Sequence, residues 1–243
     1  MTGVRILCNQ IIPVTDWNHD YVTIPSTLES QSPLPTLTSF DLLNPLDNSG
    51  NGHTVTPRGG QIRDWGLHYD DGALPSLTNF AKAGHGAVSF ITAFRLSSLS
   101  RYTNIINNRS AGKGFNVYYN SGLYLACIKP DGTVTKIISQ GTVAVPEINK
   151  WYVASGVFDP VGKVASVRFD TLGLRYDNLD AWIPENTSLD TPLSIGGDPT
   201  GSTTSSMVGD IAFVAFYDGA FTATQRDEMV SVGREVLRER GLI

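Results

Sequence analysis

The amino-acid sequence predicts an all-β protein, an antiparallel jelly-roll sandwich with one C-terminal α-helix. Its 243 residues include 24 Gly and 13 Pro, and only 17% are charged, a composition typical of short strands joined by frequent turns. Apolar and polar residues alternate at period two along most of the chain, as they do in strands with one buried face. Helical periodicity is confined to the C-terminal end. These three observations favour a sandwich over a helical bundle.

The clearest strands lie in the middle of the chain. In Val88–Leu96, alternate side chains place an apolar set on one face. Residues 115–119 and 123–127 predict a hairpin around Asn120-Ser121-Gly122, in which Gly122 can take a positive φ. Two further turns predict a strand over residues 133–140 after Pro130-Asp131-Gly132, and a hairpin of residues 151–158 and 163–169 around Asp159-Pro160-Val161-Gly162.

The C-terminal strand and helix complete the predicted sandwich. Both faces of Ile211–Tyr217 are apolar, so this strand must be covered on both sides. A covering helix is predicted over residues 222–241, because Thr222 and Gln225 fit a capping box and Gly241 provides a C-terminal stop. The apolar stripe of this helix consists of Met229, Val232, Val236 and Leu237.

The N-terminal part carries weaker signals. Residues 1–42 are predicted to form a strand and an extended connection, and residues 26–60 favour long connections because they show little periodicity. We expect one domain over residues 1–243, since apolar strands lie on both sides of this stretch. Polar residues interrupt the first apolar run, which argues against a signal peptide. No segment has the roughly 18 consecutive apolar residues that a membrane span requires.

Charge and cysteine spacing exclude two classes of site. The formal net charge is −5 and no run of Lys or Arg occurs, so we expect no nucleic-acid partner. Cys8 and Cys127 lie in strand-like contexts without the spacing of a zinc or redox motif. Two states stay open for them, buried free thiols or a disulfide.

Catalytic patterns are also missing. Retaining glycoside hydrolysis requires two carboxylates about 5–5.5 Å apart. Six Glu occur, and none has the required partner on a predicted strand: Glu29, Glu147, Glu185, Glu228, Glu235 and Glu239. No Gly-x-Ser-x-Gly elbow occurs near any of the four His, and no Lys-Ser/Thr pair follows a Gly-rich stretch. We therefore expect no catalytic residues and no cofactor.

Four short motifs occur in the order in which one family has them. They are Asp47-Asn-Ser-Gly-Asn-Gly-His53, Trp65-Gly-Leu-His-Tyr-Asp-Asp-Gly72, Leu193-Ser-Ile-Gly-Gly-Asp198 and Gly209-Asp-Ile-Ala-Phe-Val-Ala-Phe-Tyr-Asp218. The chain thereby resembles the concanavalin A-like lectin/glucanase group, particularly its laminin G-like jelly rolls, from about Leu43 to Leu242. That group includes lectins, glucanases and many phage virion proteins, so the resemblance implies a fold and leaves the function open. Some members bind calcium in the loops that match Asp47, Asp70 and Asp71; Asp side chains also cap turns, and we assign no metal site.

The densest candidate site for a ligand combines aromatic rings with amide and guanidinium groups. Sugar C–H faces stack on rings, and sugar hydroxyls need planar polar partners. Eight residues offer these groups: Tyr102, Asn104, Asn107, Arg109, Asn116, Tyr118, Asn120 and Tyr124. Alternation sends Asn116, Tyr118 and Asn120 to one strand face, opposite Phe115 and Val117. A solvated sheet face or a subunit contact is the alternative interpretation.

From these observations we expect a non-enzymatic virion surface protein, of a phage tail or capsid, that binds a host-surface glycan or receptor. The virion location follows from the family resemblance, together with the expected absence of a signal peptide in a chain made in the host cytoplasm. The alternative is a structural decoration or assembly protein without a glycan ligand; a glycan hydrolase is the third and weakest hypothesis. Expected partners are other virion proteins, in an oligomer or larger assembly without membrane insertion.

Overall fold

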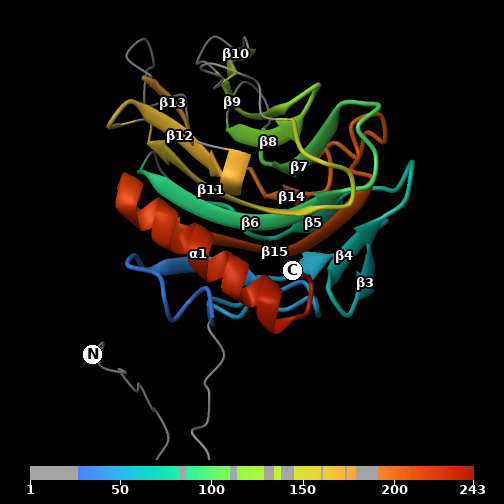
Figure 1. Ribbon diagram of the computed structural model, residues 1–243, viewed down its shortest axis with the longest axis horizontal. Helices are drawn as coiled ribbons and strands as arrows, with labels where there is room; N and C mark the ends of the chain where they lie inside the picture. The colour runs from blue at the N-terminus through green and yellow to red at the C-terminus, as the bar shows by residue number, and fades with distance from the viewer. Residues whose placement is uncertain are drawn as a thin grey trace, which may run out of the picture.

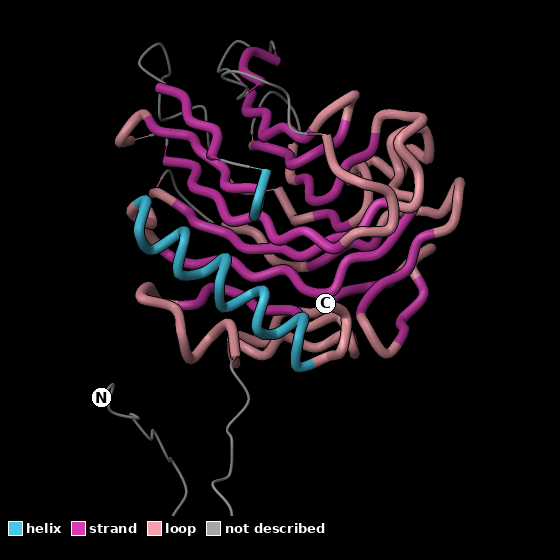
Figure 2. The backbone as a smooth tube through the Cα atoms, viewed as in Figure 1, coloured by secondary structure: helices cyan, strands magenta, loops and turns pink. Residues whose placement is uncertain are grey.

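The protein folds into two antiparallel sheets packed face to face. The computed structural model describes residues 27–82, 86–109, 114–128, 134–137, 145–159, 161–172, 174–178 and 191–243. Helix α1 (Ala223–Glu239) lies on the side of the larger sheet that faces away from the smaller one (Figure 1). Figure 2 shows that strands make up most of the body and that loops join them at its rim. The predicted fold class, an antiparallel β-sandwich with one C-terminal helix, is confirmed.

The larger sheet has the order β13-β12-β11-β6-β15-β4-β3, and β1 pairs with β15 beside β4. Its described strands are β1 (Thr36–Phe40), β3 (Gln61–Arg63), β4 (Gly66–Tyr69), β6 (Val88–Leu96), β11 (Trp151–Asp159), β12 (Val164–Phe169), β13 (Leu174–Asn178) and β15 (Gly209–Asp218). A short 3-10 helix, η1 (Asp170–Leu172), follows β12.

The smaller sheet has the order β10-β9-β8-β7-β14-β5-β2. Its described strands are β2 (Val55–Thr56), β5 (Ser76–Thr78), β7 (Thr103–Asn107), β8 (Phe115–Tyr119), β9 (Leu123–Ile128), β10 (Val134–Ile137) and β14 (Ser194–Ile195). The inner faces of the two sheets meet in one apolar core, in which Phe90, Phe115 and Phe216 stack on one another.

The predicted coverage of Ile211–Tyr217 on both faces is confirmed. In β15, Val214 and Phe216 point into the core between the sheets, whereas Phe213 and Tyr217 join a second apolar cluster under α1. The capping box of Thr222 and Gln225 is present, and Gly241 takes a φ of 68° just after the helix. The helix therefore covers the larger sheet as the sequence pattern requires.

One local prediction is wrong. Residues 26–60 contain β1 and β2 in addition to connections, and each of these strands is specified by a partner far away in sequence: β1 by β15 and β2 by β5. The predicted hairpin around Asn120-Ser121-Gly122 is confirmed, since β8 pairs with β9; in its turn Ser121 has a φ of 55° and Asn120 N donates to Gly122 O at 2.8 Å.

Several other expectations fall outside the described residues. Cys8, most of residues 1–42 and the turn at residues 130–132 lie there, so the state of the two cysteines stays open. The division into a single domain likewise stays a prediction. No described helix is long and apolar enough to cross a membrane.

Candidate functional site

The candidate ligand residues lie on the outer face of the smaller sheet, on and around β7, β8 and β9. Asn104 is opposite Tyr118, Asn107 is opposite Asn116, and Tyr118 is opposite Tyr124. Directly opposed residues of antiparallel strands share a face, so the three strands bring these five side chains together. The inner face of β8 contributes Phe115, Val117 and Tyr119 to the core, as the alternation predicts.

A β-bulge in β7 makes this arrangement possible. The pairing with β8 shifts between Asn104 and Ile106, so that Ile105 and Ile106 together oppose Val117. Both isoleucines are buried in the core between the sheets. Strict alternation would send Asn104 and Asn107 to opposite faces, whereas the extra residue returns both to the outer face.

Three tyrosine rings form a continuous row, here called the tyrosine strip (Tyr102, Tyr118 and Tyr124). The ring centroids of Tyr102 and Tyr118 are 5.0 Å apart, and those of Tyr118 and Tyr124 are 5.3 Å apart with an interplanar angle of 29°. Tyr118, in the middle, is only 5% exposed, while its two neighbours are half-buried. Aromatic rings at these separations attract each other, so the strip is a rigid surface.

A buried layer of asparagine side chains holds the strip in place. Asn116 is fully buried and Asn104 is 2% exposed. Asn116 Nδ2 donates to Asn104 Oδ1 at 2.6 Å and to the Tyr102 hydroxyl at 3.0 Å, and that hydroxyl donates to Asn104 Oδ1 at 3.0 Å. These polar groups satisfy one another, and their role is to position Tyr102.

Arg109 lies next to the asparagine layer, close to Tyr102 and Tyr118. Its Nη1 donates to Asn116 Oδ1 at 3.3 Å, and its backbone N donates to Asn107 Oδ1 at 2.8 Å. Its Nε is buried and has no hydrogen-bond partner. Arg109 and Asn116 therefore connect the charged end of the site to the asparagine layer.

The hydroxyls of Tyr102 and Tyr118 remain neutral in ordinary buffers. Burial raises the pKa of Tyr102, and the hydrogen bond from Asn116 and the charge of Arg109 oppose this shift only in part. Burial also raises the pKa of Tyr118, and Tyr102 and Tyr124 add to the effect. Neutral hydroxyls can both donate and accept hydrogen bonds, which suits a polyhydroxyl ligand.

The eight candidate residues thus divide by exposure. Tyr102, Tyr124 and Arg109 are half-buried and Asn120 is exposed at the β8–β9 turn, whereas the remaining four are buried: Asn104, Asn107, Asn116 and Tyr118. The sequence analysis missed Asp198, whose negative charge raises the pKa of Tyr102 and whose Oδ1 accepts from Thr200 N at 2.9 Å. The Gly-Gly-Asp-Pro-Thr turn around Asp198 is the signal that could have drawn attention to it.

The three aspartates considered for calcium serve other purposes. Asp47 caps its loop, because its carboxylate accepts from Ser39 N at 2.7 Å, Ser49 Oγ at 2.6 Å and His53 Nδ1 at 3.0 Å. Burial by itself raises the pKa of Asp47, but the hydrogen bonds from Ser49, Ser39 and His53 outweigh it and lower the pKa. Asp70 accepts from Gln61, and Asp71 pairs with Arg101. No group of three or more potential metal ligands occurs among the described residues.

A second polar cluster, which the sequence analysis also missed, lies on the outer face of the larger sheet. The buried Asp210 accepts from Trp65 Nε1 at 2.8 Å and Arg95 Nε at 2.8 Å, and lies 2.9 Å from His68 Nδ1. The Arg95 guanidinium also lies 5.0 Å from the ring centroid of Trp151. Because these groups are paired with one another, the cluster is a closed network that leaves no free carboxylate oxygen for a ligand.

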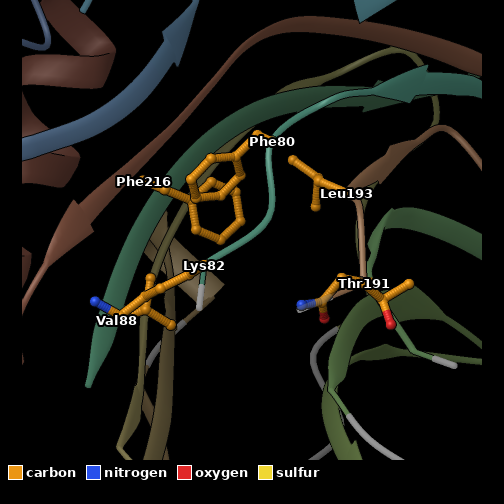
Figure 3. A pocket seen from close by; sticks show the side chains of 7 residues that line it. Phe80, Lys82, Val88, Thr191, Leu193 and Phe216 are labelled. Carbon is orange, nitrogen blue, oxygen red and sulfur yellow. The ribbon is translucent and has the colours of Figure 1, made fainter. Parts of the chain in front are cut away.

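The hollow at one end of the sandwich is apolar and small. It contains about 220 Å³ of empty space, part of it open to solvent, and Figure 3 shows Phe80, Val88, Leu193 and Phe216 lining it. Lys82 stands at the hollow and pairs with Asp218. Since few polar groups point into it, this hollow does not suit a saccharide.

The fold and the outer-face site together define a concanavalin A-like β-sandwich with a polar-aromatic surface. No family model and no curated protein sequence matches the chain. Solved structures do match at the level of the fold, and one of them is domain 4 of AbnA, an extracellular arabinanase of Geobacillus stearothermophilus, in complex with arabinotriose. That match has 12% identity and a TM-score of 0.61, and covers 81% of this chain and 98% of the domain.

Two botulinum neurotoxin structures match over part of their length. The binding domain of serotype D has 12% identity and a TM-score of 0.61 over 87% of this chain and 54% of the toxin chain. A type C toxin, whose cell entry depends on interaction with two ganglioside molecules, has 10% identity and a TM-score of 0.57 over 83% of this chain and 51% of the toxin chain. The chain thus spans about half of these toxin chains, and at such identities the likeness shows the fold alone.

Proposed function

We propose that the protein is a non-enzymatic glycan-binding module and that the tyrosine strip is its binding surface. The observation that carries the proposal is the row of three tyrosine rings fixed from below by the buried Asn104 and Asn116. Such a surface offers ring faces to sugar C–H groups, while Tyr102, Arg109 and Asn120 can bond to hydroxyls. Structures of the same fold were solved with arabinotriose or interact with gangliosides, which supports this choice of ligand class.

The proposal includes a binding role without catalysis. Hydrolysis by paired carboxylates needs two acids at the sugar. The electrostatic neighbours of Tyr102 include one carboxylate, Asp198, which is engaged with Thr200. Incubating the protein with bound oligosaccharides and finding them unchanged supports this part; released reducing ends contradict it.

A glycan array followed by calorimetric titration tests the surface. Tyr102→Ala and Tyr124→Ala should each weaken binding about tenfold, because about 1.4 kcal/mol of ring contact is lost. Leu46→Ala is the matched control, since Leu46 is 59% exposed and lies outside the strip, and its affinity should stay within about twofold of the parent protein. Unchanged binding in both tyrosine variants contradicts the proposal.

We further propose that the module stands on the surface of a virion. The support is the resemblance of its four motifs to concanavalin A-like domains that phage virion proteins carry. Antibody against this chain should label intact particles purified from the source, at a stoichiometry fixed from batch to batch. Absence of the chain from washed particles contradicts this location.

A structural role in an assembly is a second candidate function, and exposed apolar side chains favour it. Leu43, Leu46 and Ile62 are 39%, 59% and 40% exposed, and the last belongs to β3, the edge strand of the larger sheet. Exposed apolar residues at a sheet edge suit a protein contact. Light scattering should then show an oligomer that Ile62→Lys disrupts, whereas a monomer at high concentration counts against this role.

A further inference from the structure

Arg109 has no carboxylate partner in the part of the chain that the structure describes, unlike Arg95, Arg101 and Arg234. Arg95 pairs with Asp210 at 2.7 Å and Arg234 pairs with Asp170 at 2.6 Å. Arg101 likewise pairs with Asp71. Among the described residues, no carboxylate lies within ion-pair distance of Arg109. A guanidinium that is partly removed from water without a counter-charge is unfavourable, and an incoming anion would relieve this cost.

The donors of Arg109 are incompletely used. Nη1 donates to Asn116 Oδ1, but Nε is buried and lacks any partner. A buried, unsatisfied donor in a native protein calls for an explanation such as a bound group. Arg109 also acts electrostatically on both Tyr102 and Tyr118, so its charge lies near these two rings of the tyrosine strip.

The guanidinium is held in place before any ligand arrives. Asn116, which is fully buried, uses its Nδ2 on Asn104 and Tyr102, and this fixes its Oδ1 toward Arg109. An arginine fixed in this way loses less side-chain freedom on binding. The negative charge of Asp198, in contrast, acts on Tyr102 from another position. An anionic group is therefore favoured at Arg109 and disfavoured beside Asp198.

We propose that the site selects an acidic saccharide, whose carboxylate or sulfate pairs with Arg109 while its ring packs on the tyrosine strip. The planar guanidinium matches the geometry of a carboxylate or sulfate and forms charge-assisted hydrogen bonds with it. This inference rests on the proposed glycan-binding function and adds the chemical class of the ligand. Arg109 is then the residue that determines specificity.

The test compares sugars that differ only in charge. Trigalacturonic acid is titrated against its carboxyl-reduced form, and 3′-sialyllactose against lactose. We expect the protein to bind the acidic member of at least one pair about tenfold more tightly, and this preference to shrink between about 50 and about 500 mM salt as screening increases. Arg109→Gln should remove the preference by lowering the affinity for the acidic sugar more than that for the neutral one, and Arg109→Lys should retain part of the preference.

Arg63→Gln is the matched control, because it makes the same change of charge at an exposed position on β3, away from the strip. A thermal melt of each variant verifies that it is folded. Equal affinity for acidic and neutral sugars overturns the inference, as does a preference that survives in Arg109→Gln. If acidic and neutral sugars bind equally and Tyr102→Ala weakens that binding about tenfold, the glycan site stands and only its acidic selectivity fails. If none of the four sugars binds, both proposals are overturned.

Discussion

The outer faces of the two sheets differ in what buries their side chains. On the larger sheet, Ile91, Phe213 and Tyr217 are buried against the apolar side of α1. On the smaller sheet, Asn104 and Asn116 are equally buried, yet they are paired through hydrogen bonds with each other and with Tyr102. The first face is closed by an element of the same chain, whereas the second presents half-buried tyrosines and an arginine that has no carboxylate partner among the described residues. Burial alone therefore does not separate core from site, but the chemistry of the buried groups does.

The largest effect should come from the face under the helix. Phe213→Ala should lower the free energy of unfolding by about 3–5 kcal/mol, because Phe213 is fully buried and its loss leaves a cavity. Urea unfolding measures this change. Tyr124→Ala, at the half-buried end of the tyrosine strip, is the matched aromatic truncation and should cost about 1 kcal/mol or less. Equal losses in the two variants would mean that the outer faces are energetically alike.

The polar face should respond to loss of its buried amide. Asn116→Ala should cost about 1–3 kcal/mol, because Asn104 Oδ1, the Tyr102 hydroxyl and Arg109 Nη1 all lose a partner at a buried position. Urea unfolding again reports the change, and Asn120→Ala, at the exposed turn, should stay within about 0.5 kcal/mol of the parent protein. A neutral Asn116→Ala variant would show that the asparagine layer does not hold the face together.

The sequence predicts those parts of this contrast that depend on residues near one another in the chain. The helix-covered face follows from local patterns: the apolar run of β15, the capping box at Thr222 and the stop at Gly241. The membership of the polar face was also foreseen, since alternation places Asn116 and Tyr118 together. The deep burial of Asn104 and Asn107 on this face was not foreseen, because it depends on the bulge at Ile105 and on pairing with β8. For the same reason the place of β1 did not follow from the sequence, although a strand was predicted somewhere within residues 1–42: its partner, β15, lies far along the chain.

A smaller effect should come from the start of the helix. Thr222→Ala removes the hydroxyl that accepts from Gln225 N at 3.2 Å, and it should cost about 1 kcal/mol. That loss is smaller than the one expected for Phe213→Ala, because packing under the helix contributes more to its stability than the cap does. Thr224→Ala is the control. Thr224 is exposed and is the second residue of the helix, so this substitution should leave the free energy of unfolding nearly unchanged. A Thr222→Ala loss as large as that of Phe213→Ala contradicts this ranking.

The smallest effect should appear only in alkaline solution. Burial raises the pKa of the Tyr118 phenol above its ordinary value of 10.0, and the neighbouring Tyr102 and Tyr124 raise it further. Above about pH 10 the unfolded chain loses this proton while the folded protein retains it, so the free energy of unfolding must fall as the pH rises; below about pH 10 the stabilising contribution is fully present. Tyr118→Phe should therefore make the decline in stability above pH 10 shallower. Tyr217→Phe, under the helix, should do the same, because burial also raises the pKa of Tyr217. Urea midpoints measured between about pH 8 and about pH 11 test both variants. If Tyr217→Phe flattens the decline and Tyr118→Phe does not, the polar face admits water to its tyrosines, and the contrast between the two faces is greater than their burial indicates.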